Sequence, residues 1–474
     1  MLLVIVRLPW VGDLGMHAAT IQRLRHSLLH PGNPLVDADT PSPYYSPWML
    51  LLGCLARVTG LSVFVVLRFA AVIGLGLLVS GVWRYVRTLS AARAAPAVAL
   101  LCLLLLWGPS LFEWSGFLGL NSLALTVSYP SVFALGLAFH FWAWLTRALR
   151  GGAGTGRAVW PGLGALWALI LLCHQFTGVV ASLGALATLI AARPGRAVLV
   201  RSAVAVLLGL LVLWLWPYYD FFSLFSAGAG LEAIHRPLYG HLLGRFGLVL
   251  LGVVALGLRF RRDRWDPLVI FFALGVLVFA AGGVSGHYSW GRVLPAALIP
   301  AQLAAALEAV DAVNAVRGGR RRTVWACALG AALALGVWTQ AGTVGYVVRP
   351  SALPEVVAAR YRAPWAGYRW ITPWVRYGDV VMARTRPARQ IPAYGAYTVA
   401  PGYPDVFLTD AGRRETAVRR YFAAGTAGDV RRGILRAYGV RWVVDRGSDA
   451  GTGPGLRVVA RGPDGQVLYR VAGS

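Results

Sequence analysis

The sequence predicts an α-helical polytopic membrane protein with about eleven transmembrane helices and a small C-terminal domain, α/β or α+β, outside the membrane. Of the 474 residues, 57% are hydrophobic and only 14% are charged, whereas a soluble domain carries roughly 25% charged residues. Apolar stretches recur along the chain at about the 20-residue length that a helix needs to cross the bilayer core. These two observations exclude an ordinary soluble protein.

The charge pattern explains a net charge of +26 without invoking nucleic acid. All 45 basic residues are arginine, and many fall in short clusters between apolar segments. By the positive-inside rule such clusters lie in the cytoplasm. The clusters are at residues 84–93, 147–157, 193–201, 259–264 and 317–322.

The clusters divide the apolar segments into spans. The apolar stretch 160–192 must leave and return to the same side, which predicts a hairpin of two short helices turning near His174 and Gln175. The odd number of spans places the N-terminus inside and the tail outside. The first span has only about eleven residues, so either flanking residues extend it or part of a longer helix is missing. Spans are expected near residues 1–11, 62–83, 95–109, 129–146, 160–173, 176–192, 197–217, 241–258, 267–284, 292–312 and 323–346.

Composition also divides the chain into domains. We expect a transmembrane domain at 1–346, with a first outer loop at 12–61, and a soluble extracytoplasmic domain at 347–474. The tail is richer in turn formers and contains short β-rich runs at 378–382, 439–444 and 466–471.

The predicted topology gathers carboxylates, imidazoles and aromatic side chains on the outer face, which is where we expect any chemistry. Asp13 directly follows the first apolar segment and precedes a helical pattern. It is either an N-cap or a base that deprotonates an acceptor hydroxyl.

The rest of the first loop offers further candidates. Asp37 and Asp39 flank Ala38 in a proline-rich stretch and are either part of a solvated turn or ligands of a divalent cation or of sugar hydroxyls. Tyr44 and Tyr45 are either a stacking platform for a sugar or part of an interfacial aromatic belt.

These features resemble the GT-C glycosyltransferases, integral membrane enzymes that use polyprenyl-phosphate sugars. An acid follows the first span, and the long outer loop has two juxtamembrane helices. The second of these, near Leu50 to Leu61, begins after Tyr44-Tyr45-Ser46-Pro47. His174-Gln175-Phe176-Thr177-Gly178 is similar to a His-Pro-x-Thr-Gly turn of related proteins, with Gln175 in place of proline. The resemblance covers roughly residues 1–346.

The resemblance implies that Asp13 is the catalytic base, while a second acid stays open among Asp37, Asp39 and Glu113. Arg292 begins a span from the outer side and is either a bidentate phosphate clamp, assisted by His287, or an interfacial arginine. His174 interrupts an apolar hairpin, which marks either a site residue or a structural turn.

The resemblance implies an inverting transfer of a hexosyl or pentosyl group, with arabinose and mannose as candidates. The donor is a polyprenyl-phosphate sugar, and the acceptor is a cell-envelope glycan or glycolipid outside an actinobacterial plasma membrane. No cofactor is required by the pattern, although Asp37 and Asp39 leave a Mg²⁺ or Mn²⁺ ion open. The alternatives are a transporter or flippase of lipid-linked sugars and a non-catalytic envelope scaffold.

Overall fold

A computed structural model describes residues 1–151, 154, 156, 158–226, 230–314, 319–446 and 455–472. Arg157 and Arg317, two members of the predicted cytoplasmic clusters, lie outside these residues.

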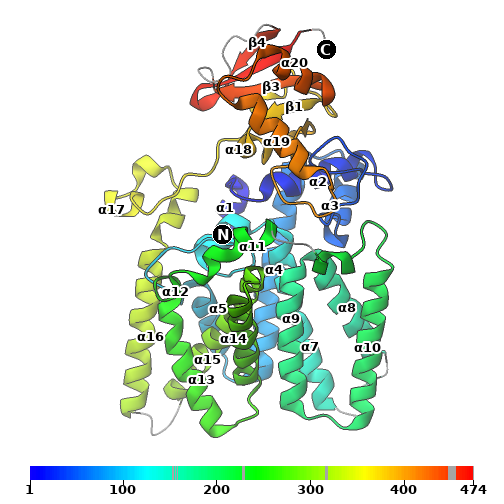
Figure 1. Ribbon diagram of the computed structural model, residues 1–474. Helices are drawn as coiled ribbons and strands as arrows, with labels where there is room; N and C mark the ends of the chain where they lie inside the picture. The colour runs from blue at the N-terminus through cyan, green and yellow to red at the C-terminus, as the bar shows by residue number, and fades with distance from the viewer. Residues whose placement is uncertain are drawn as a thin grey trace. The chain divides into compact units, whose positions relative to one another are not determined.

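Long apolar helices dominate the fold and run alongside one another (Figure 1). Within the described residues, eight helical segments have the length and composition to cross a membrane. Four are α4 (Val63–Leu89), α7 (Pro130–Gly151), α9 (Gln175–Ala192) and α10 (Arg196–Trp214). The fifth is Leu242–Arg262, which contains α12 (Leu242–Phe246) and α13 (Leu250–Arg262), and the sixth is α14 (Pro267–Ser285). The seventh is Tyr288–Asn314, which ends in α15 (Pro295–Asn314), and the eighth lies within α16 (Gly319–Thr339).

The predicted count of about eleven spans is not confirmed, because three of the expected spans are short helices. These are α1 (Leu2–Arg7), α5 (Ala95–Leu105) and α8 (Val159–Cys173). With a rise of 1.5 Å per residue, even α8 measures only about 22 Å against a hydrocarbon core of about 30 Å. The predicted hairpin is present, since α8 ends at Cys173 and α9 begins at Gln175.

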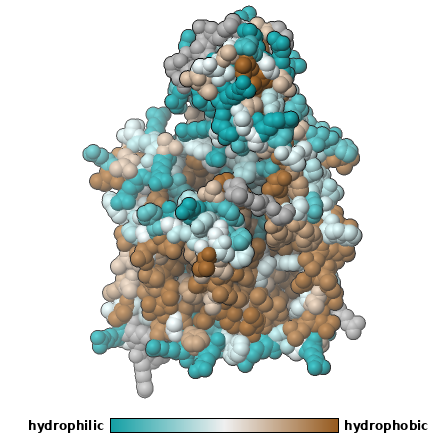
Figure 2. Space-filling view, in the orientation of Figure 1, coloured by the Kyte–Doolittle hydropathy of each residue, from teal (hydrophilic) through white to brown (hydrophobic). Residues whose placement is uncertain are grey.

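The helix surfaces carry the hydrophobic side chains that a bilayer requires. Figure 2 shows a continuous hydrophobic band over the long helices, with hydrophilic residues at their ends. By contrast, the membrane-length window around α15 is fully buried. Its many alanines let α13, α14 and α5 approach closely, as small residues do between membrane helices.

Contacts divide the chain into two units. The first contains Met1–Pro9, Ala70–Leu215 and Ala227–Ala363, and the second contains Trp10–Phe69, Trp216–Ser226 and Pro364–Ser474. The first loop, which the sequence suggested as part of the transmembrane domain, thus groups with the tail. The short helices of the first unit include α6 (Leu120–Thr126), α11 (Gly230–His235) and α17 (Glu355–Ala358).

The second unit combines the loop helices with a mixed sheet. The loop contains α2 (Leu14–His26) and α3 (Pro47–Thr59), so both predicted juxtamembrane helices are present. The tail contains α18 (Thr385–Ala388), α19 (Ala411–Phe422) and α20 (Gly428–Ala437). Its strands are β1 (Val380–Ala383), β2 (Tyr397–Thr398), β3 (Val440–Arg446), β4 (Leu456–Arg461) and β5 (Gln466–Val471), and all three predicted β-rich runs are among them.

The sheet has strand order β2-β1-β3-β5-β4. β1 is parallel to β2 and β3, whereas β5 is antiparallel to β3 and β4. Side chains alternate along β1, so Val380 and Met382 join one core while Val381 and Ala383 join the other. Burial on both faces makes β1 a continuous apolar run and gives the tail two cores.

Candidate functional site

A break between two helices of the first unit presents a histidine to a pocket. His174 has an extended backbone between α8 and α9 and is the N-cap of α9. Its Nδ1 accepts a hydrogen bond from the Thr177 amide at 3.2 Å and lies 2.8 Å from Thr177 Oγ1. Nδ1 is thereby engaged with Thr177, and Nε2 is the ring nitrogen that faces the pocket. The cap therefore decides which ring nitrogen faces the pocket.

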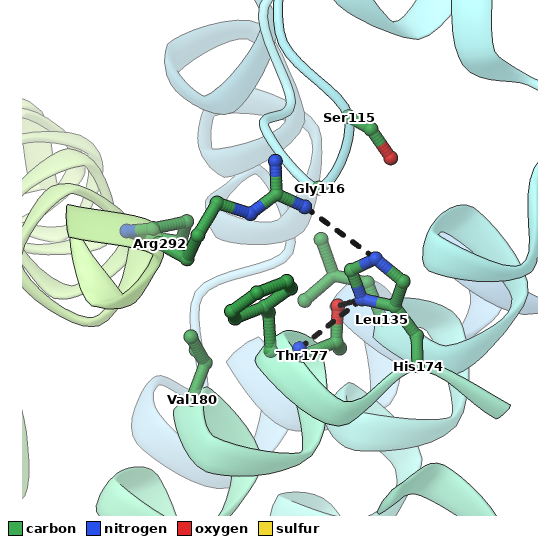
Figure 3. Close-up of a pocket in the computed structure, with 9 residues that line it drawn as sticks. Ser115, Gly116, Leu135, His174, Thr177, Val180 and Arg292 are labelled. Carbon is green, nitrogen blue, oxygen red and sulfur yellow. Dashed lines mark hydrogen bonds between the residues drawn. The ribbon is translucent and has the colours of Figure 1, made fainter. Parts of the chain in front are cut away.

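A buried arginine faces that nitrogen. Arg292 comes from the short 3₁₀ segment Tyr288–Val293 that leads into α15, and it is only 7% exposed. Its Nη2 lies 3.5 Å from His174 Nε2 (Figure 3). A guanidinium N–H and the imidazole Nε2 thus lie within hydrogen-bonding distance of each other at the pocket. A buried cation beside an imidazole forms a site suited to an oxyanion.

Aromatic rings surround the Arg292 guanidinium. Its Cζ lies 4.7 Å from the centroid of the Phe176 ring and 5.9 Å from that of Trp114. His235, at the end of α11, contacts both rings, with centroid separations of 5.5 and 5.9 Å. Burial lowers the pKa of His235, and the Arg292 charge lowers it further, which favours the neutral ring beside the cation. The rings keep Arg292 out of bulk water and contact its guanidinium through their faces.

A carboxylate fixes the turn that carries Arg292. Glu232 of α11 accepts hydrogen bonds from the Ser289 amide at 2.8 Å and from Ser289 Oγ at 2.7 Å. Since Ser289 and Arg292 belong to the same 3₁₀ segment, this pair holds α11, with His235, against the segment.

The pocket itself is small. Its free volume is about 10 Å³, the lower limit for a single water. Gly116, with a φ of +85°, brings the loop before α6 over the pocket. The volume admits one oxygen-sized group in this conformation and no sugar ring. The lining residues are Ser115, Gly116, Leu135, His174, Phe176, Thr177, Val180, Arg292 and Pro295.

Two other residues predicted in this unit lie elsewhere. Glu113 accepts a hydrogen bond from Asn121 Nδ2 at 2.8 Å and lies 3.6 Å from Arg362 Nη1. Its carboxylate is thus engaged in an ion pair. His287 is exposed, its Nδ1 lies 2.9 Å from Ser285 Oγ, and its ring stacks on Trp290. Neither residue is in the pocket lining, so the predicted assistance of Arg292 by His287 has no support in the geometry.

In the second unit, Asp13 occupies the N-cap position of α2 without acting as a cap. Within the described helix, its side chain accepts no capping hydrogen bond. Its negative charge raises the pKa of Tyr403 and contributes to the raised pKa of Tyr44, although burial is the larger cause for both phenols. Asp13 is half-buried among these tyrosines. The capping interpretation therefore lacks its defining hydrogen bond.

The remaining first-loop candidates divide into exposed and packed residues. Asp37 and Asp39 are both exposed. Tyr45 is 1% exposed, and its hydroxyl donates to Gly32 O at 2.8 Å. The stacking-platform interpretation does not fit Tyr45, because a buried ring has no face for a sugar. Tyr44 is half-buried and donates to Pro404 O.

Comparison with solved structures relates this arrangement to known membrane enzymes. The cryo-EM structure of arabinofuranosyltransferase AftD from Mycobacteria matches with a TM-score of 0.61 and 16% identity, covering 100% of this chain and 39% of that one. A mutant form of AftD matches with a TM-score of 0.61 and 17% identity, covering 100% of this chain and 41% of that one. This chain shares its fold with AftD, in line with the GT-C-like fold that the sequence predicts.

The chain spans about two fifths of the AftD chains that it matches. The apo oligosaccharyltransferase of Archaeoglobus fulgidus aligns with a TM-score of 0.49 and 12% identity, over 99% of this chain and 71% of that one. No family model and no curated protein sequence matches the chain.

The described residues give the predicted divalent-ion site only two ligands. In the part of the chain that the structure describes, no three His, Cys, Asp or Glu residues are grouped as metal ligands. Asp37 and Asp39 are both exposed, and Mg²⁺ is typically held by one or two carboxylates together with waters and substrate phosphates. The ion at Asp37 and Asp39 therefore stays a prediction.

Sequence reasoning missed Trp114, Phe176 and His235 as site residues. Phe176 directly follows the helix break, and Trp114 lies in an aromatic and glycine-containing loop, so both had a weak local signal. His235 had none beyond its expected position on the outer face. These three residues are identified as site residues only by their packing around Arg292 in the folded chain.

Proposed function

We propose that the chain is a membrane glycosyltransferase that takes a sugar from a polyprenyl-phosphate donor and transfers it to a cell-envelope glycan or glycolipid on the outer face of the plasma membrane. The observation that carries this proposal is the convergence of Arg292 and His174 in a pocket, with Nη2 and Nε2 at 3.5 Å. The GT-C fold supports a membrane enzyme of this class.

The buried Arg292 guanidinium beside His174 suits a phosphate leaving group. When the bond between the sugar and the phosphate breaks, the phosphate oxygen gains negative charge. Donors that are already in place stabilise such charge without reorganising. The pocket admits one oxygen-sized group, so a phosphate oxygen enters between Arg292 and His174 while the sugar stays outside.

Asp13 is proposed as the base that deprotonates the acceptor hydroxyl. The acceptor hydroxyl oxygen attacks the anomeric carbon, its proton passes to the Asp13 carboxylate, and the electron pair of the breaking bond goes to the phosphate. A single displacement of this kind inverts the anomeric centre. The argument for Asp13 rests on its position directly after the first apolar segment and on the GT-C resemblance, and it is independent of the argument for Arg292.

The test uses the full chain in nanodiscs with radiolabelled decaprenyl-phosphate arabinose or mannose and envelope acceptors. Arg292→Gln should lower kcat by about 10²-fold, the usual effect of removing one donor to a developing oxyanion. Arg292→Lys keeps the positive charge but loses the planar guanidinium, so its activity should fall between that of the wild type and that of Arg292→Gln. Asp13→Asn should abolish transfer.

The matched control is Arg236→Gln, because Arg236 is an exposed cation of the neighbouring 3₁₀ segment Arg236–Tyr239. Its activity should equal that of the wild type. Undiminished transfer by Arg292→Gln would contradict the phosphate assignment, and undiminished transfer by Asp13→Asn would move the base to another acid. Translocation of lipid-linked sugar without transfer would favour the flippase alternative.

A further inference from the structure

A second hollow in the first unit lies at the start of the candidate span Leu242–Arg262 and has a volume of about 670 Å³. This is within the range of about 300–1,000 Å³ that is typical of small-molecule sites. It shares no lining residue with the His174 and Arg292 pocket. Its lining residues are Ser110, Leu111, Tyr239, His241, Leu242, Leu243, Gly244 and Arg245.

The walls of this groove are joined by backbone hydrogen bonds. The Ser110 amide donates to Gly244 O at 2.8 Å, and the Leu248 amide donates to Trp107 O at 2.9 Å. A Cβ at Gly108 would lie only 2.3 Å from Gly244 O, so the two backbones approach as closely as glycine allows. The groove is therefore a built feature of the fold rather than a gap between loosely placed loops.

The polar lining favours an anion. Arg245 is half-buried, His241 and Ser110 are exposed, and no acidic side chain lines the groove. Arg245 Nη1 donates to Pro237 O at 2.5 Å, and its Cζ lies 5.5 Å from the Phe112 ring centroid. These contacts hold the guanidinium at the groove. Among the described residues, Pro237 O is its one hydrogen-bond acceptor, which leaves further N–H donors for a ligand.

The apolar lining favours an amphiphile over a free ion. Leu243 is 72% exposed and Leu242 is 37% exposed, and both begin a candidate membrane span. The end of a span lies at the depth of lipid headgroups. A cation beside exposed leucines at that depth matches a phosphate headgroup followed by a hydrocarbon chain. An arginine that only extends its charge to the headgroup region would not require a groove beside it.

We propose that this groove binds the phosphate headgroup of a membrane lipid on Arg245, with the lipid chain along Leu242 and Leu243. The lipid site is separate from the proposed donor-phosphate pocket and does not depend on the proposed function. The loop 108–117 lines both sites, the groove through Ser110 and Leu111 and the pocket through Ser115 and Gly116.

Native mass spectrometry of the full chain in detergent tests the proposal with phosphatidylglycerol as the probe. The wild type should retain one lipid saturably. Arg245→Gln should weaken retention about tenfold, in line with the loss of a charge-assisted hydrogen bond. Ser110→Phe, which adds a ring to an exposed wall, should weaken it as well. The control Arg236→Gln should bind as the wild type does.

Three results would overturn the lipid site. Equal retention by Arg245→Gln and the wild type would show that the groove cation does not hold the lipid. Equal losses in Arg245→Gln and Arg236→Gln would show only a general effect of charge. Displacement of the lipid by inorganic phosphate at equal concentration would identify the ligand as free phosphate. The loss of lipid in Arg245→Gln should leave the Arg292 transfer assay measurable, so failures of the two proposals are distinguishable.

Discussion

A buried arginine holds the first loop to the tail, and its removal should open the second unit locally. Arg23 of α2 is 0% exposed. Its Nη1 and Nη2 donate to Gly395 O at 2.9 Å and to Ala396 O at 2.6 Å, and its Cζ lies 3.6 Å from the Tyr397 ring centroid. Its Nε also donates to Pro34 O at 3.4 Å. Replacement by methionine fills most of the volume but leaves these three carbonyls without this donor.

The magnitude follows from those contacts. Each bond to a charged donor contributes about 1.5–3 kcal/mol, and a desolvated cation–π contact contributes about 2 kcal/mol. The methionine side chain returns part of the packing, so we expect a net loss of about 4 kcal/mol in the local opening free energy. Because about 1.4 kcal/mol corresponds to a factor of ten, local opening should become about 10³-fold more frequent.

Hydrogen exchange provides a specific assay for this opening. The Thr398 amide donates to Leu35 O at 2.9 Å, which joins the tail to the first loop, so its exchange reports the opening directly. Arg25→Met is the matched control on the same helix, because Arg25 makes only long bonds, of 3.4 and 3.3 Å, to Leu61 O and Gly60 O. The control should change Thr398 exchange by about twofold or less. Unchanged exchange of Thr398 in Arg23→Met would refute the reasoning.

Two further predictions concern the same unit. Burial lowers the pKa of His17 to about 3. The neutral His17 therefore contributes fully to the free energy of unfolding above its unfolded pKa of about 6.5. This contribution, at most about 5 kcal/mol, is lost as the pH falls from 6.5 toward 3. His17→Leu should flatten the pH dependence of thermal unfolding between those values, and an identical pH dependence in both proteins would contradict the assignment. A Cβ at Gly15 would lie 1.8 Å from Arg389 O, so Gly15→Ala should lower the free energy of unfolding by about 2 kcal/mol or more. Gly412→Ala, with nothing within 4 Å of the added Cβ, should leave it nearly unchanged, and equal melting temperatures for the two variants would show that α2 does not pack as described.

The sequence alone was sufficient for the membrane class, the helical hairpin at His174, both juxtamembrane helices and three of the five strands. These features depend on local patterns: apolar runs of span length, a polar break within one, and short β-rich runs between turn formers. The number of spans could not be obtained in this way. α5 and α8 are apolar enough to suggest spans, but their lengths depend on where each helix ends against its neighbours.

Which residues meet was decided only by the tertiary structure. His174 and Arg292 are 118 residues apart in the chain, and Arg23 bonds to carbonyls more than 370 residues away. Nothing local to either arginine indicates these distant partners. The sequence around an arginine is the same whether the side chain contacts a headgroup, a histidine or a backbone carbonyl. Burial and convergence separate these cases, and both are properties of packed helices rather than of sequence patterns.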